Sequence, residues 1–179
     1  MIRTTRFSFS TFLPLTISAI LIGSFGFANA ALADSLENDA AQVEYRQTLM
    51  GIVGANMGAM GDIMKNGLTL PGHVAVHAGQ MAEMAQLIAP AFKNNIATDA
   101  TDAKQKIWQD WTKFESAIGD FEEAARNLQA AAKGGDMATV GPAMKALGKS
   151  CGGCHKPFRK PKEESFKSKA GHAGHDDHG

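Results

Sequence analysis

The residues of this chain best suited to chemistry are two cysteines and a histidine near its C-terminal end. Cys151, Cys154 and His155 stand in the order Cys-Gly-Gly-Cys-His, and the 179-residue sequence holds no further cysteine. Two thiols three positions apart lie on one helical turn, so each can form a thioether with one porphyrin while the next imidazole faces the iron. The pattern therefore predicts one covalently bound haem c, with His155 as an axial ligand of its iron.

Three other kinds of site use paired cysteines. A thioredoxin-type redox pair follows a strand in an α/β fold, and a structural zinc ion needs four ligands where this cluster offers three. A simple disulfide would leave His155 without a role. Because the chain shows no strand periodicity, we favour haem attachment over these alternatives.

The N-terminal region has the pattern of an export signal. Arg3 and Arg6 precede an apolar stretch, and small residues then allow cleavage after Ala30 or Ala33. The apolar stretch is short for a bilayer and is interrupted by Ser, Thr and Pro, which disfavours a membrane anchor. Residues 1–33 are therefore predicted to be a signal peptide, which implies a periplasmic protein with no stable membrane insertion.

The charge and size of the remaining chain limit what it can do. The full sequence balances 18 Lys and Arg against 18 Asp and Glu, and removal of the two arginines of the leader leaves a small acidic excess. Nucleic-acid-binding domains carry a basic excess, so we expect no nucleic-acid partner. The length after cleavage suits one domain with one core.

Four segments repeat apolar residues at alternating steps of three and four. They cover about residues 38–65, 72–92, 102–133 and 136–159. In the first segment Met50 shares its stripe with Val43 and Met57, and in the last segment both cysteines share a stripe with Leu147. This period is typical of helices packed in a bundle, and no segment alternates with period two. The sequence predicts an all-α fold, an antiparallel four-helix bundle within residues 34–160.

Two prolines affect the last predicted helix. Proline lacks an amide donor and clashes with the preceding turn. Pro142 therefore predicts that the regular part of this helix starts near Gly141, and Pro157 predicts that the helix loosens just after His155.

Residues 161–179 show no periodicity and predict a flexible tail. Its His172, His175 and His178, beside two aspartates, could bind divalent copper, nickel or zinc weakly, although a solvated tail is the favoured interpretation. The basic stretch at residues 159–162 could guide docking to an acidic redox partner or only add solubilising charge.

Three stretches together resemble the cytochrome c-prime family, the class II c-type cytochromes. They are Tyr45-Arg46-Gln47 followed by Met50, Lys106-Ile107-Trp108 followed by Phe114, and the cysteine motif followed by Phe158-Arg159. The resemblance covers roughly residues 38–160, and the low-spin cytochrome c-556 branch is the most similar. It implies an antiparallel four-helix bundle with haem near one end.

The resemblance also implies a role for Met50. It falls at the position opposite His155, where low-spin members bind the iron through a methionine sulfur and high-spin members leave it five-coordinate. Met50 could instead be a core residue, as we expect for Met57 and Met64 on the same stripe. We favour ligation because Gly51 would let the helix approach the haem closely.

Polar residues around this position have several interpretations. The resemblance implies that Arg46 and Gln47, one turn before Met50, lie against the haem edge or its propionates, although Arg46 could be solvated. His73 and His77 could reach a propionate or the iron, but local hydrogen bonding is the favoured interpretation.

These observations favour an electron carrier with His155 and Met50 as axial ligands. The alternative is a five-coordinate protein that binds or scavenges NO or CO. We do not expect an enzyme, because a peroxidase would need a polar histidine and arginine pair beside the iron. The redox partner protein is unidentified, and the resemblance implies that a homodimer through the first two helices can form.

Overall fold

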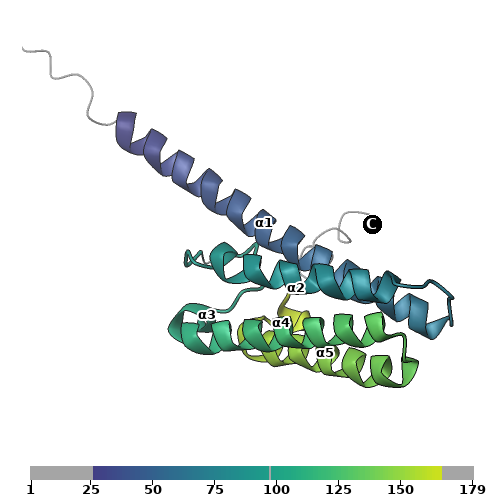
Figure 1. Ribbon diagram of the computed structural model, residues 1–179. Helices are drawn as coiled ribbons and strands as arrows, with labels where there is room; N and C mark the ends of the chain where they lie inside the picture. The colour runs from purple at the N-terminus through teal and green to yellow at the C-terminus, as the bar shows by residue number, and fades with distance from the viewer. Residues whose placement is uncertain (1–25, 97, 167–179) are drawn as a thin grey trace, which may run out of the picture. The chain divides into compact units, whose positions relative to one another are not determined.

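The computed structural model describes residues 26–96 and 98–166, with side chains from residue 37 onward except that of residue 137 (Figure 1). The chain divides into two units, residues 1–35 and 36–179, and the account below concerns the second. Most of the predicted signal peptide and the three tail histidines lie outside the described residues. None of the helices in the described ranges is long and apolar enough to cross a membrane.

Helices account for nearly all of the described secondary structure. In chain order they are α1 Gly26–Lys65, α2 His73–Ala91, α3 Lys106–Gln109, α4 Trp111–Gly134 and α5 Met137–Phe158, followed by a 3₁₀ turn at Lys162–Glu164. Within the described ranges the sole bridge between extended segments joins Ala103 and Arg159 in antiparallel orientation. The four long helices form the predicted all-α, antiparallel four-helix bundle, and Figure 1 shows α2, α4 and α5 side by side.

The core follows the predicted apolar stripes. Its most deeply buried side chains come from all four long helices: Leu49, Met60, Met81, Leu128, Val140 and Leu147. Gly79 allows α2 to lie close to α4. A Cβ atom at this position would collide with the side chain of Gln129. Burial of one face of each helix supplies the main stabilising free energy of such a bundle.

The third predicted helix is divided in two. Asp110 adopts a non-helical backbone, φ −135° and ψ 50°, between α3 and α4. The indole of Trp108 donates a hydrogen bond of 2.7 Å to the carbonyl of Phe92, which ties the short α3 to the end of α2. The periodicity of the apolar residues continues through this break, so the sequence pattern did not reveal it.

The expected effects of the two prolines on α5 were wrong. The helix begins at Met137 because the carboxylate of Asp136 caps it, accepting a hydrogen bond of 2.9 Å from the amide of Ala138. Pro142 is exposed in the second turn, where a carbonyl that loses its partner can be hydrated. At the other end α5 continues through Pro157 to Phe158.

The folded part of the chain extends past the predicted boundary at residue 160. Residues 160–166 pack against the loop before α3, and Ser165 is buried. The amide of Lys160 donates to the carbonyl of Asp102 at 2.7 Å, and the amide of Lys104 donates to the carbonyl of Phe158 at 2.9 Å. The predicted flexible tail therefore cannot begin before residue 167.

Candidate haem-binding site

A cavity of about 540 Å³ lies among α1, α4 and α5. Such a volume is in the range of sites for small organic cofactors. Its lining includes every residue that the sequence analysis assigned to haem binding: Cys151, Cys154, His155, Met50, Arg46 and Gln47. The fold thus brings together residues more than 100 positions apart in the sequence.

The cysteine motif lies on the last two turns of α5. Cys151 and Cys154 are free thiols, both partly buried, and no disulfide joins them. Burial raises the pKa of the Cys151 thiol, and burial followed by the proximity of Cys151 raises the pKa of Cys154 to about 11. Without attached haem both groups are therefore protonated thiols at neutral pH, and no cluster of three metal-binding side chains surrounds them in the described residues.

His155 lines the same cavity and is exposed to solvent on its other side. Loss of water around the ring, followed by the positive charge of Arg159, lowers the pKa of His155. The imidazole is therefore neutral at pH 7, which is the form that binds a metal.

The α1 side of the cavity combines two methionines with two glycines. Met50 and Met57 are partly buried and line the cavity, as do Gly51 and Gly54. A Cβ atom on either glycine would meet no other atom within 4 Å. The sequence analysis assigned Met57 only to packing, and the structure also places it in the cavity wall.

Arg46 is the most buried charged residue of the site, with 2 % of its surface exposed. Its Nε and Nη2 atoms donate hydrogen bonds of 2.7 Å to the carbonyls of Ala91 and Asn94, and the guanidinium lies 4.8 Å from the ring centroid of Phe92. Its remaining nitrogen, Nη1, is buried without a hydrogen-bond partner among the described residues. Arg46 is therefore not a solvated surface residue, and burial lowers its pKa despite the charge of Asp39.

Gln47 ties α1 to the loop that precedes α3. Its side-chain amide donates a hydrogen bond of 2.8 Å to the carbonyl of Ala100. Together with Arg46 it fixes Asn94 and Ala100 of this loop against the start of the cavity-lining part of α1.

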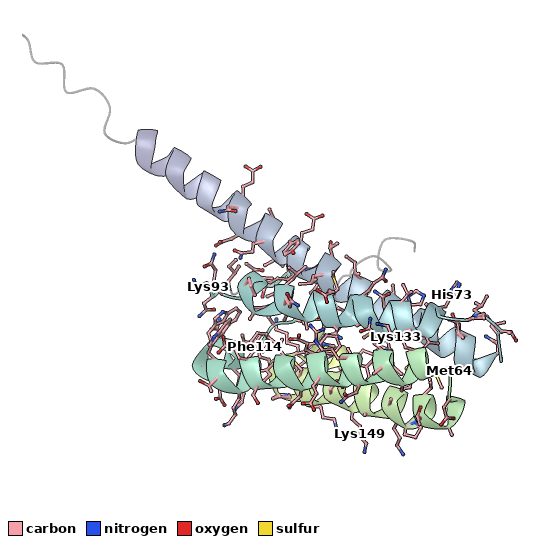
Figure 2. All side chains as sticks on the ribbon, viewed as in Figure 1. Met64, His73, Lys93, Phe114, Lys133 and Lys149 are labelled. Atoms are coloured by element: carbon pink, nitrogen blue, oxygen red, sulfur yellow. The ribbon has the colours of Figure 1, made fainter. Side chains whose placement is uncertain are left out.

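Aromatic rings form the wall opposite α1. Phe114 packs edge-to-face against Phe92 and Phe158, with ring centroids 5.5 and 5.3 Å apart, and Phe121 adds a fourth ring to the lining. Figure 2 shows Phe114 at the end of the bundle opposite Met64 and His73. The cavity thus has a largely apolar interior, with polar groups at Arg46 and Gln47, in the loop before α3 and at the C-terminal end of α5.

Several lining residues were missed by the sequence analysis, and two of them make contacts that join distant parts of the chain. Asp102 and Phe166 both line the cavity, and the carboxylate of Asp102 accepts hydrogen bonds from Arg159, Ser165 and the amide of Phe166. No local pattern links positions 64 residues apart. The same contacts pair the charge of Arg159 within the protein, which leaves less of the basic stretch for docking.

The two histidines of α2 lie elsewhere. His77 bonds through Nδ1 to the side-chain oxygen of Asn56 at 2.7 Å, and His73 is exposed. Neither lines the cavity, and the bond of His77 to Asn56 agrees with the favoured interpretation for that residue.

Known proteins similar to this chain share its motifs and its fold. The family described as Cytochrome C' matches residues 41–159. A cytochrome c' from Rhodospirillum rubrum is 37% identical over 121 residues, which is 67% of this chain and 82% of that protein. A cytochrome c-556 from Rhodopseudomonas palustris is 34% identical over 124 residues, covering 65% of this chain and 81% of that protein.

Solved structures of cytochrome c' have a fold similar to that of this chain. Cytochrome c' from Shewanella frigidimarina superposes with a TM-score of 0.63 at 31% identity, covering 69% of this chain and 97% of that one. A nitric oxide complex of a variant cytochrome c' from Alcaligenes xylosoxidans gives a TM-score of 0.63 at 26% identity, with the same two coverages of 69% and 97%. The chain therefore belongs to the cytochrome c' family and is a four-helix-bundle protein whose cofactor is covalently bound haem c.

Proposed function

We propose that this protein is a periplasmic electron carrier whose haem is attached to Cys151 and Cys154 and whose iron is bound by His155 and Met50. The single observation that supports this most is the shared cavity. It collects two thiols and an imidazole from α5 and a thioether from α1 around one apolar space. When bound, haem supplies an iron that accepts and releases one electron.

The residues present fit such a cofactor. The buried Nη1 of Arg46 has no hydrogen-bond partner among the described residues, and a buried donor on a charged group is costly unless an acceptor satisfies it. A haem propionate is an acceptor of the right charge. Gln47, also in the cavity lining, is the second residue proposed to lie at this edge.

The axial residues and the aromatic wall would adapt the site to electron transfer. Two protein ligands hold the iron in nearly the same geometry in both oxidation states, and a thioether ligand raises the reduction potential. Phe114, Phe121 and Phe158 exclude water from the interior, which also favours the reduced, less charged state.

A second candidate is a five-coordinate protein that binds NO or CO. One solved relative, from Alcaligenes xylosoxidans, is a nitric oxide complex, and Gly51 and Gly54 leave open room on the α1 side of the cavity. In this alternative Met50 would only line the cavity.

The test is the optical spectrum of the purified holoprotein and of a Met50→Leu variant. The electron-carrier proposal expects a low-spin wild type with a weak sulfur-to-iron band in the oxidised state, and a high-spin variant with a lower potential and faster CO binding. Met57→Leu is the matched control, since Met57 lines the same cavity one heptad later. A wild type that is already high-spin and binds CO readily would favour the second candidate.

Export and assembly belong to the same proposal. Cleavage after Ala30 or Ala33 would release the mature protein into the periplasm, and N-terminal sequencing of the protein from that compartment tests it. Exposed apolar side chains on α1 and α2, namely Tyr45, Ile52 and Val76, support a homodimer through these helices. Analytical ultracentrifugation of wild type and Val76→Glu tests that part.

A further inference from the structure

We propose that residues 159–166, held in place by Asp102, form a wall of the haem cavity, and that Phe166 limits the access of water and small ligands to the haem. This inference rests on the proposed location of the haem in the cavity. In this proposal Asp102 positions the segment, and Phe166 determines how easily water and small ligands reach the haem.

Asp102 is the point to which the C-terminal segment is fastened. Its Oδ2 accepts hydrogen bonds from Ser165 Oγ at 2.8 Å and Arg159 Nη2 at 3.1 Å, and its Oδ1 accepts from the Phe166 amide at 2.9 Å. Its own carbonyl accepts from the Lys160 amide at 2.7 Å. One residue thus holds the segment at its start and at its end.

The hydrogen bonds to Asp102 from Ser165 and from the Phe166 amide are partly buried, whereas the side chain of Arg159 keeps 50% of its surface exposed. Ser165 is 4 % exposed and Thr101 is 6 % exposed, and the Asp102 side chain keeps 10 % of its surface exposed. The Lys160 ammonium donates a further hydrogen bond of 2.8 Å to the carbonyl of Thr101. Charge-assisted hydrogen bonds with little competing water are stronger than those at an open surface, so the segment is held firmly.

The fastened segment reaches the cavity itself. Arg159 and Phe166 both line it, as do Thr101, Asp102 and Ala103 from the loop that the segment contacts. The same loop is held from the other direction by Gln47 of α1, through the carbonyl of Ala100. The wall therefore connects α1 to the end of α5 around the cavity.

A phenyl ring in this wall has a defined physical effect. An apolar side chain in the lining keeps water from the cofactor, and solvent exposure is one of the variables that set the potential of a haem. It also narrows the path of a small neutral ligand such as CO. Without the ring, the potential should fall and ligand entry should become faster.

The experiment uses the full-length holoprotein with Phe166→Ala, Phe166→Leu and, as matched control, Glu163→Gln, which alters an exposed residue of the same segment. Spectroelectrochemical titration should give a lower potential for Phe166→Ala, a value nearer wild type for Phe166→Leu and no change for the control. In a Met50→Ala background, which leaves the iron open whatever Met50 does, Phe166→Ala should accelerate CO binding several-fold.

The role of Asp102 is tested through its effect on Phe166. Asp102→Asn should increase amide hydrogen exchange at residues 160–166 and accelerate CO binding in the Met50→Ala background. The double variant Asp102→Asn with Phe166→Ala should be no faster than Phe166→Ala alone, because residues that act through one another are not additive. Additive effects would overturn the positioning role.

Two outcomes separate this inference from the proposed function. If Phe166→Ala keeps the potential and the CO-binding rate of the protein without this substitution, and its haem is still covalently attached, the proposed wall is wrong. The proposed function would then still stand. A purified protein without covalent haem would overturn the proposed function, and the wall with it.

Discussion

At the end of the bundle that carries Met64 and His73, the side chains between the helices are almost completely buried, whereas the end that carries Phe114 contains the cavity (Figure 2). In the first region Met60, Leu128 and Leu147 are each 0 % exposed. In the second, Met50 and both cysteines are only partly buried. The same helices α1, α4 and α5 thus pack tightly over one part of their length and surround a cavity over another.

Part of the difference comes from the size of the side chains on the stripe of α5. Cys151 and Cys154 lie seven residues after Met144 and Leu147 and replace these larger side chains in the cavity region. A region of large side chains is stabilised by its own packing, while a region of small ones depends on what fills it. Substitutions in the two regions should therefore have different consequences.

The largest expected effect is at the cavity. Cys151→Ala with Cys154→Ala should abolish covalent attachment, because no thiol remains to form a thioether. Denaturing gel electrophoresis with haem staining, together with the mass of the intact protein, measures this. The haem-free variant should also melt at a lower temperature than the holoprotein, since a bound cofactor stabilises the native state. Haem released from the wild type by acid-acetone would contradict the assignment.

In the tightly packed region, Leu147→Ala should destabilise the protein strongly while leaving the haem spectrum unchanged. Removal of a fully buried leucine costs about 2–5 kcal/mol because a cavity is left behind. Met57→Ala in the cavity wall, a partly buried residue, should cost clearly less. Chemical denaturation of the two holoproteins provides the comparison, and equal losses would show that the two regions do not differ in this way.

Arg46→Met should lower the free energy of unfolding by an intermediate amount, and the loss should depend on whether haem is bound. The change removes the guanidinium donor of the carbonyls of Ala91 and Asn94, although Gln42 still donates to Ala91 at 3.4 Å. A hydrogen bond of a charged group contributes about 1.5–3 kcal/mol. If Nη1 meets a haem propionate, the loss should be larger in the holoprotein than in the haem-free cysteine variant. Arg126→Met, at an exposed pair with Glu122, is the control, and equal losses in both forms would exclude the propionate contact.

The smallest expected effect is on the pH dependence of the free energy of unfolding, through the contact of Asp102 with the C-terminal segment. Burial alone would raise the pKa of Asp102, but hydrogen bonds from Phe166, Ser165 and Arg159 outweigh it and hold the pKa below its usual value. A lowered pKa means that the ionised carboxylate stabilises the native state. That contribution is complete above the unfolded-state pKa of about 3.9 and is lost as pH falls through the native pKa.

The measurement is the free energy of unfolding between pH 3 and pH 7 for wild type and Asp102→Asn. The difference between the two should be largest near neutral pH and should shrink below about pH 4. Asp120→Asn, at an exposed position of α4, serves as control. A difference that stays constant over the whole range would show that Asp102 does not act through its charge.

Much of this protein could be predicted from its sequence, because the signals involved are local. The spacing of Val43, Met50 and Met57 reports one face of one helix, and the cysteine motif is contiguous. The resemblance at Tyr45-Arg46-Gln47 placed Arg46 in the candidate site. These features need only neighbouring residues, so the all-α bundle and the haem cofactor could be predicted from them.

Only the tertiary structure decided the features that depend on distant residues or on the local backbone. The cap at Asp136 starts α5 before Gly141, where Pro142 had predicted its regular part to begin, and the non-helical backbone of Asp110 divides a segment that appears continuous in the sequence. The burial of Arg46 depends on the end of α2, and the contact between Asp102 and Phe166 joins positions 64 residues apart. A hydrogen bond across such a separation leaves no periodic trace in the sequence, because it requires only that folding bring one acceptor and one donor together.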